Sequence, residues 1–287
     1  MKLLSCLLAA FLVVPAVLTA LAVDPPAPKR DDSASEKLGM KLSLQCWTFN
    51  RLSFFETVDK AAGLGIKYIE IYPGQTLKPG SKEKISHDMS DAVCTEVLKK
   101  LADAGGLKLV AYGVDGIPTS EPAARKEFDW AKKMGISALV TETKPNDVLE
   151  KLAIEYNIRI ALHNHPTSWP PDDVLAATKD RSKLLGSCSD IGHWMRRGLN
   201  PVEQLKKLEG HIEHVHFKDL NALDAGAHDV PWGTGKGDPK ALLVELKRQG
   251  YQGYLSIEYE YGSLEQLDKE LPQCVAFFDK TMTELAK

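Results

Sequence analysis

The sequence predicts a single parallel (β/α)₈ barrel, and three observations lead to this fold. The chain has 287 residues, and one barrel of this class takes about 250. From residue 40 onward, short apolar runs alternate with amphipathic helical segments. Glycine follows several of these helical segments and precedes the next run, at Gly65, Gly105, Gly135 and Gly250, where a left-handed residue ends a helix at little cost.

The apolar runs are expected to be strands because they are short, continuous and bounded by polar turns. They are Leu42–Thr48, Tyr68–Tyr72, Leu107–Gly113, Ala138–Thr143, Arg159–His163, Gly186–Asp190, Ile212–Lys218 and Tyr254–Glu258. The helices expected between them are Phe54–Leu64, Asp88–Ala104, Glu121–Met134, Asn146–Tyr156, Pro239–Gln249 and Ser263–Leu285. Eight such units normally close into a barrel. The alternative is an open doubly wound sheet, but no Gly-x-Gly-x-x-Gly follows the first strand.

The first 22 residues have the layout of a secretory signal peptide. Lys2 precedes an apolar run from Leu3 to Val14, and small residues end in Ala20-Leu21-Ala22. A retained membrane anchor is the alternative, but Pro15 interrupts the run, so we expect no stable membrane insertion after cleavage. Residues 23–39 are expected to be a flexible linker and residues 40–287 the barrel. The protein is therefore expected to be exported to the periplasm or the extracellular space.

The composition excludes some function classes. Hydrophobic residues make up 44% and charged residues 26% of the chain, which is ordinary for a globular enzyme. The net charge of −3 argues against a nucleic-acid partner, because phosphate backbones require a basic surface. Four cysteines follow the signal segment without a CxxC motif, and we expect free thiols. The sequence leaves the oligomeric state open, a homo-oligomer included.

Polar side chains end the later strands, where the catalytic groups of such barrels lie. Four of them form a mixed oxygen and nitrogen ligand set: Glu142, Asp190, His216 and Glu258. This set suits one divalent metal ion, with Mn²⁺ preferred and Mg²⁺, Co²⁺ or Zn²⁺ as alternatives. For Glu142 taken alone, a salt bridge is the competing interpretation. His214 shares a face with His216, so one of the two is expected to bind metal while the other orients a ligand or the substrate.

Further polar and aromatic residues near these strand ends are expected to bind substrate. They are His193, His165, Asn164, His214, Lys218 and Trp232. The sequence His163-Asn164-His165 can also be interpreted as a nuclease-like motif or as a capped loop, and three residues are weak evidence for the nuclease. The glycine-rich segment after Trp232 can close over a barrel mouth, cradle phosphate or form a plain turn.

Several segments together resemble the xylose isomerase-like TIM-barrel superfamily, in its sugar phosphate isomerase/epimerase branch, from roughly Lys41 to the C-terminus. The segments are Ser43–Phe49, Ser189-Asp190-Ile191-Gly192-His193, His214-Val215-His216-Phe217-Lys218-Asp219, Gly233–Asp238 and Ile257-Glu258. The resemblance implies that Glu142, Asp190, His216 and Glu258 bind the metal, that Glu142 and Glu258 are the catalytic acid and base, and that His193 lies near the substrate. Such relatives often carry Glu-Asn-His where this chain has His163-Asn164-His165.

The expected activity is that of a metal-dependent sugar isomerase or epimerase, which moves a proton through a metal-stabilised enediolate. The substrate class is a small-molecule sugar or keto-sugar. A lyase that eliminates from a 3-keto-glycoside shares the first step, and export favours it. A non-catalytic sugar-binding barrel is a further alternative. An endonuclease is opposed by the acidic charge balance.

Overall fold

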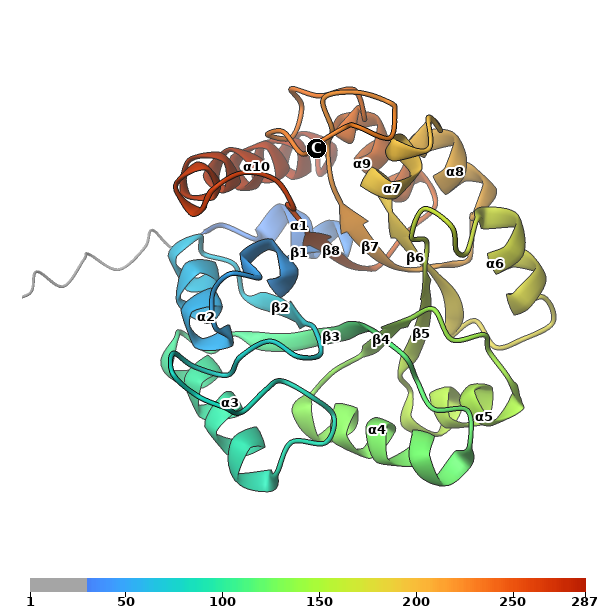
Figure 1. The fold of residues 1–287 in the computed structure, drawn as a ribbon. Helices are drawn as coiled ribbons and strands as arrows, with labels where there is room; N and C mark the ends of the chain where they lie inside the picture. The colour runs from blue at the N-terminus through green and yellow to red at the C-terminus, as the bar shows by residue number, and fades with distance from the viewer. Residues whose placement is uncertain (1–29) are drawn as a thin grey trace, which may run out of the picture.

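The eight predicted strands form a closed parallel barrel in a computed structural model that describes residues 30–287. Neighbouring strands pair in chain order, and β1 pairs with β8 to close the ring. Figure 1 shows the strands at the centre and the helices around them. The strands are β1 (Met40–Gln45), β2 (Tyr68–Ile71), β3 (Lys108–Asp115), β4 (Ala138–Thr141), β5 (Arg159–His163), β6 (Leu185–Asp190), β7 (Ile212–Phe217) and β8 (Gly253–Ile257).

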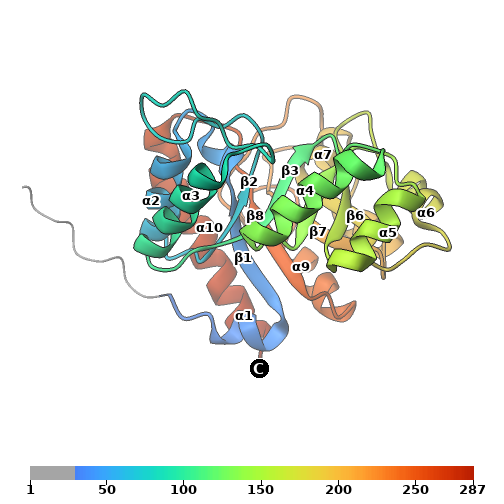
Figure 2. The ribbon, with the colours of Figure 1, turned by 90° about the horizontal axis from the view of Figure 1, so that it is seen from below.

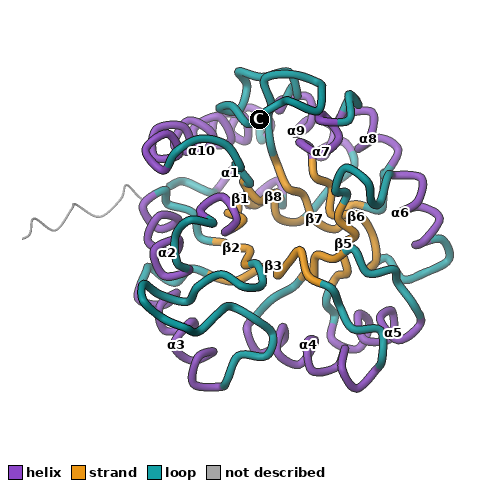
Figure 3. The backbone as a smooth tube through the Cα atoms, viewed as in Figure 1, coloured by secondary structure: helices purple, strands orange, loops and turns teal. Residues whose placement is uncertain are grey.

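Helices cover the outside of the barrel, and loops join them to the strands (Figure 3). The long helices are α2 (Phe54–Gly63), α3 (Asp91–Asp103), α4 (Glu121–Met134), α5 (Asp147–Tyr156), α9 (Pro239–Arg248) and α10 (Leu264–Leu285). The shorter ones are α1 (Ser33–Leu38), η1 (Cys46–Phe49), α6 (Pro171–Thr178), α7 (Ile191–Arg196) and α8 (Pro201–Lys207). The barrel prediction is confirmed, and the long helices lie within a few residues of their expected bounds.

The expected linker is not irregular throughout. Ser33–Leu38 forms helix α1, which packs against α10. Arg30 donates to Asp279 of α10 at 2.9 Å, and Gly39 ends the helix with a positive φ. This corrects the linker prediction for residues 33–38: the segment is too short for a helical period to be recognised, and its stability comes from tertiary packing. In Figure 2, α1 lies beside the C-terminus at one end of the barrel.

The predicted signal peptide, residues 1–22, lies outside the described residues. Within residues 30–287, no helix combines the length and apolar character needed to cross a bilayer. Cys46, Cys94, Cys188 and Cys274 are all buried and free, which confirms the expectation of free thiols.

Candidate active site

A pocket opens at the carboxyl ends of the strands, where this fold places catalytic groups. Its lining combines aromatic, glycine and ionisable residues: Gln45, Trp47, Tyr72, Pro73, Gly113, Val114, His163, His165, His193, Glu258 and Glu260. Trp47 and Tyr72 pack edge to face, with ring centroids 5.0 Å apart. The pocket therefore has one aromatic wall and one ionisable wall.

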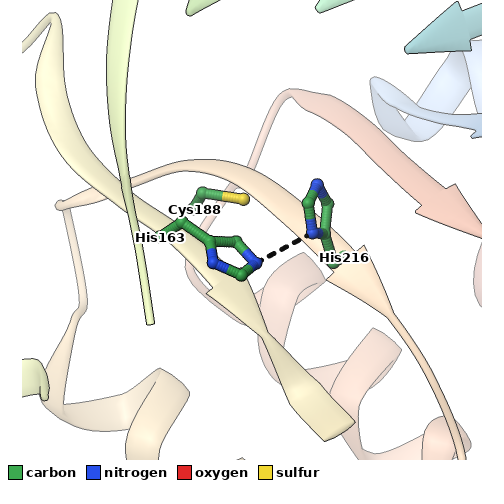
Figure 4. A group of neighbouring side chains, drawn as sticks. All are labelled: His163, Cys188 and His216. Atoms are coloured by element: carbon green, nitrogen blue, oxygen red, sulfur yellow. Dashed lines mark hydrogen bonds between the residues drawn. The ribbon is translucent and has the colours of Figure 1, made fainter. Parts of the chain in front are cut away.

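Four buried side chains on consecutive strands point their ligand atoms at one place beside this pocket. They are His163, Asp190, His216 and Glu258, and the four ligand atoms lie within 4.8 Å of one another. His163 Nε2 lies 3.1 Å from His216 Nδ1, as Figure 4 shows. His216 Nδ1 also lies 3.1 Å from Glu258 Oε2. We call these four residues the strand-end group.

Asp190 connects the strand-end group to the backbone. It ends β6 and caps α7, and its Oδ1 accepts a hydrogen bond from the His193 amide at 2.7 Å. Its Oδ2 lies 3.0 Å from Lys218 Nζ, 3.6 Å from His163 Nε2 and 3.7 Å from His216 Nδ1. Three nitrogen atoms therefore surround this buried carboxylate oxygen. Two imidazole nitrogens and two carboxylate oxygens facing one point fit a divalent metal ion.

Lys218 places a positive charge against the same carboxylates. Its side chain is fully buried, and Nζ lies 3.0 Å from Asp190 Oδ2 and 2.9 Å from Glu258 Oε2. Burial raises the pKa of Glu258, but the charges of Lys218 and His216 outweigh this and lower it. Glu258 is therefore ionised at neutral pH while it lines the pocket.

Glu70 lies beneath the strand-end group and orients two histidines. Its carboxylate contacts His214 Nε2 at 2.7 Å and His216 Nε2 at 2.9 Å. Burial favours the neutral acid, but the two imidazoles outweigh it and hold the pKa of Glu70 well below its usual range. Because His216 uses Nε2 for this contact, its Nδ1 is the nitrogen that faces the strand-end group. Such carboxylate–imidazole support fixes the tautomer and the orientation of metal ligands.

The structure brings together three of the four predicted ligands and places Glu142 elsewhere. Glu142 follows β4, is 41% exposed, and contacts His165 Nδ1 and the Ser168 hydroxyl. His163 of β5 supplies the fourth ligand atom of the group instead. The physical reason is the choice of partners: Glu142 pairs with His165 and Ser168, the polar residues that follow β5, whereas Glu258 is held by Lys218 and His216.

The residues predicted to bind substrate separate into two sets. His193 and His165 line the pocket, with ring centroids 5.1 Å apart. The other four act as supports. Asn164 Nδ2 donates to the Asp190 carbonyl at 3.0 Å, and Asn164 Oδ1 accepts from the Asp190 amide at 2.7 Å. Lys218 and His214 contact carboxylates below the pocket, and Trp232 is buried against Phe217.

The glycine-rich loop after β7 is held by one carboxylate. The backbone amides of Gly233, Gly235 and Gly237 each donate to Asp219, all at 2.9 Å. A Cβ on Gly235 would lie 2.3 Å from Asp219 Oδ1, so only glycine permits this approach. These amides are occupied by the protein's own anion, and this result opposes the phosphate-cradle interpretation.

Sequence reasoning missed several pocket residues. Gln45, Trp47, Tyr72, Gly113 and Val114 come from the first three strands and the segments after them. Gln45, Trp47 and Tyr72 stand at or just beyond strand ends, so the rule applied to the later strands could have identified them. Glu70 was also missed, although a charged residue in the apolar run Tyr-Ile-Glu-Ile is a signal of a paired buried group.

Burial and ion pairing set the charge of the remaining pocket groups. Burial lowers the pKa of His193 to about 4 despite the nearby Asp190, so this imidazole is neutral at pH 7. Burial opposes ionisation of Glu260, but Lys218 and Arg196 outweigh it and lower the pKa to about 2. Glu260 accepts from Lys218 Nζ at 2.9 Å and from Arg196 Nη1 at 2.7 Å, so Lys218 is shared between Glu258 and Glu260.

Cys188 of β6 lies beside His163 and His216 (Figure 4) and forms a second compact group with them. Burial raises the pKa of this thiol to about 12, so it remains protonated. Binding a metal ion through Cys188 would require the loss of this proton, whereas the pKa values of the Asp190 and Glu258 carboxyls are lowered by their neighbours. The strand-end group is therefore the better ligand set.

Comparison with known proteins agrees with the barrel fold. The family model described as xylose isomerase-like TIM barrel matches residues 58–281. The chain belongs to this family. An inosose dehydratase of Clostridium botulinum is 33% identical over 133 residues, which cover 39% of this chain and 44% of that protein. The chain thus spans less than half the length of this curated relative.

Solved structures share the fold over most of the chain. An uncharacterized protein from Parabacteroides distasonis superposes with a TM-score of 0.69 at 35% identity, covering 84% of this chain and 99% of its own. The probable 3-DHS dehydratase of petrobactin synthesis in Bacillus anthracis gives 0.60 at 17% identity, covering 83% and 98%. At that identity, the second likeness supports the fold alone.

Proposed function

We propose that this protein is a metal-dependent lyase that eliminates water or an alcohol from a keto-sugar or keto-cyclitol. The carrying observation is that Glu258 is the one residue of the strand-end group that is an ionised carboxylate and also lines the pocket. His163, Asp190, His216 and Glu258 would hold one divalent ion, with Mn²⁺ preferred. When bound, such an ion supplies Lewis-acid polarisation of a carbonyl oxygen.

Glu258 acts as the base. It takes the proton from the carbon beside the carbonyl, and the electron pair of that C–H bond forms the new C=C bond. The bond from the next carbon to its oxygen substituent breaks, and that oxygen leaves with the electron pair. Lys218 and His216 hold Glu258 in place, so the base approaches the substrate from the β8 side of the pocket.

His165 is the proton donor to the leaving oxygen. Its Nδ1 contacts Glu142, which leaves Nε2 for the pocket that His165 lines. A carboxylate behind an imidazole fixes the orientation of the ring, as in other carboxylate–histidine pairs. In this proposal Glu142 acts through His165 and is a positioning residue.

A dehydratase class is consistent with the name of the curated relative. That protein is named an inosose dehydratase, and dehydration of a keto-cyclitol begins with removal of a proton beside a carbonyl. The position of His163 supports the same choice. Where relatives of the isomerase branch often carry glutamate, this chain has a buried imidazole, whose pKa burial lowers. A neutral imidazole in the strand-end group offers no second carboxylate base there.

A sugar isomerase or epimerase is the second candidate. It is favoured by the presence of two proton-carrying positions on the pocket, Glu258 and the Glu142–His165 pair, because epimerisation needs a group on each face of the substrate. In that case the product has the same mass as the substrate, whereas elimination yields an unsaturated ketone and a released water or alcohol.

The test is incubation of the Mn²⁺-loaded protein with an inosose, a 3-keto-glucoside and free ketoses in D₂O. We expect mass loss and enone absorbance from the first two, with deuterium exchange beside the carbonyl. Glu258→Gln should abolish both, while His165→Gln should retain exchange and slow elimination about 100-fold. Mass-conserving conversion would replace the lyase proposal by the isomerase, and absence of exchange in the wild type would contradict both.

We also propose that the protein acts after export, so its substrates are compounds outside the cytoplasm. The support is the layout of residues 1–22 described above. N-terminal sequencing of protein recovered from the periplasm or medium is expected to start at Val23. Recovery of full-length chain from the cytoplasm alone would contradict export and leave the chemistry untouched.

A further inference from the structure

A second compact group of ligand-type side chains lies between β3, α4 and the loop that joins β2 to α3. It comprises His87 of this loop, Asp115 at the end of β3 and Glu127 of α4, and their ligand atoms lie within 4.8 Å of one another. His87 Nδ1 lies 3.2 Å from Asp115 Oδ2 and 3.9 Å from Glu127 Oε2. None of the three lines the pocket of the candidate active site.

Glu127 is the residue that calls for an explanation. Its side chain is 0% exposed, and over residues 30–287 neither carboxylate oxygen has a hydrogen-bond partner. Leaving a carboxylate unpaired in such a place costs several kcal/mol. Burial, partly offset by His87, raises the pKa of Glu127 to about 7. The site therefore requires either a proton or a cation to accompany this side chain.

The surroundings of Glu127 favour a cation. One imidazole nitrogen and two carboxylates from three separate elements converge there, a mixed set that suits a first-row divalent ion. A surface hollow lined by His87, Asp88 and Trp130 reaches the His87 side of the group.

We propose that His87, Asp115 and Glu127 bind a second divalent cation of the Zn²⁺ or Mn²⁺ class, separate from the strand-end group. The ion fastens the β2–α3 loop to β3 and α4. Its effect extends to the candidate active site, because Gly113 and Val114 of the same strand line that pocket, two residues or fewer before Asp115. The ion is therefore structural and holds one pocket wall in position.

The experiment compares the full chain with Glu127→Gln, which keeps the shape and removes the charge. Apo protein is dialysed against Zn²⁺ and, separately, Mn²⁺, and bound metal is counted by atomic spectroscopy. With at least one of these ions, we expect Glu127→Gln to bind one equivalent fewer than the wild type. In a His163→Ala background, which impairs the strand-end group, added metal should raise Tm by about 5 °C, and the additional Glu127→Gln change should remove this rise.

Asp115→Asn is the second variant, in case Glu127→Gln does not fold, and the same loss of one equivalent is expected. Lys126→Gln is the matched control, since it alters a charge in the neighbouring hollow without touching the group, and its metal count should equal that of the wild type. Equal metal content in wild type and in either folded variant would overturn the proposal. A metal-independent gain in stability in Glu127→Gln would identify a protonated carboxyl and would also overturn it.

Discussion

The two halves of the barrel give the same pocket different properties. The later half, β5 to β8, ends in ionisable groups: His163, Asp190, His216 and Glu258. The earlier half, β1 to β4, contributes mainly shape: Trp47, Tyr72, Gly113 and Val114. Glu70 belongs to the earlier half but acts on the later one, through His214 and His216. This difference indicates that the ionisable side chains can be concentrated at the ends of adjacent strands, while the residues of the earlier half shape the pocket for a substrate.

The largest effect is expected from a substitution in the strand-end group, in the later half of the barrel. His163→Ala removes one of two facing imidazole nitrogens, and we expect metal affinity and turnover of a keto-sugar to fall by at least about 100-fold. Metal titration and turnover are measured on the same preparation. An unchanged metal affinity would mean that the strand-end group does not bind the ion.

A smaller loss should follow when the support beneath that half is altered. Glu70→Gln keeps the volume but loses the charge that orients His216, so metal affinity should decrease by about 10 to 100-fold. Isothermal titration measures the affinity, and circular dichroism checks that the barrel still folds. Wild-type affinity in a folded Glu70→Gln protein would show that His216 needs no such partner.

A substitution in the earlier half of the barrel should weaken substrate binding more than it slows the chemical step. Trp47 is 41% exposed and forms the aromatic wall with Tyr72, so Trp47→Ala should raise KM about 10-fold and leave kcat within about twofold. Steady-state kinetics separates the two constants. A large decrease in kcat with unchanged KM would show that the earlier half takes part in the chemical step, and the two halves would then not differ in role.

The smallest effect on activity is expected at the opposite end of the barrel. Glu213 lies near the amino end of β7, where burial raises its pKa to about 7 despite Arg159 at 3.0 Å. The folded protein keeps a proton that the unfolded chain releases near its ordinary pKa of 4.5. Folding stability therefore declines as pH rises from about 4.5 to 7.

Glu213→Gln should remove this decline, adding about 2 kcal/mol at pH 8 and almost nothing at pH 4, with turnover unchanged. Urea unfolding at the two pH values measures the difference. An equal change in stability at both values would mean that the proton of Glu213 is not involved.

The fold could be predicted from the sequence because the βα units carry their own hydrophobic period and several of their helices end at a glycine, such as Gly135 after α4. The short helices could not, since six-residue α7 depends on its Asp190 cap and on tertiary contacts. Asp190, His216 and Glu258 were found because they end apolar strands. His163 was named only as part of the segment His163-Asn164-His165 and was not predicted as a ligand, because a strand-end histidine and a strand-end glutamate are both suited to bind a metal ion.

Glu142 illustrates the limit of reasoning by position along the chain. Glu142 follows β4 by one residue and Glu258 follows β8 by one residue, but only Glu258 joins the strand-end group. The partners that hold Glu142, His165 and Ser168, come from a different connection. Which loop residues meet across a barrel mouth depends on three-dimensional packing, and a single sequence does not encode it in any local pattern.

Asp219 accepts hydrogen bonds from three backbone amides of the glycine-rich loop, and this has a consequence for how sequences of this family are compared. Gly235 and Gly237 are required by the close approach of the loop to Asp219, and Gly233 by its positive φ and its contact with Phe277, irrespective of the compound in the pocket. The glycine pattern is therefore a marker of scaffold ancestry. Two proteins that share it can differ entirely in substrate, and the side chains of the pocket walls are the positions at which specificity should be compared.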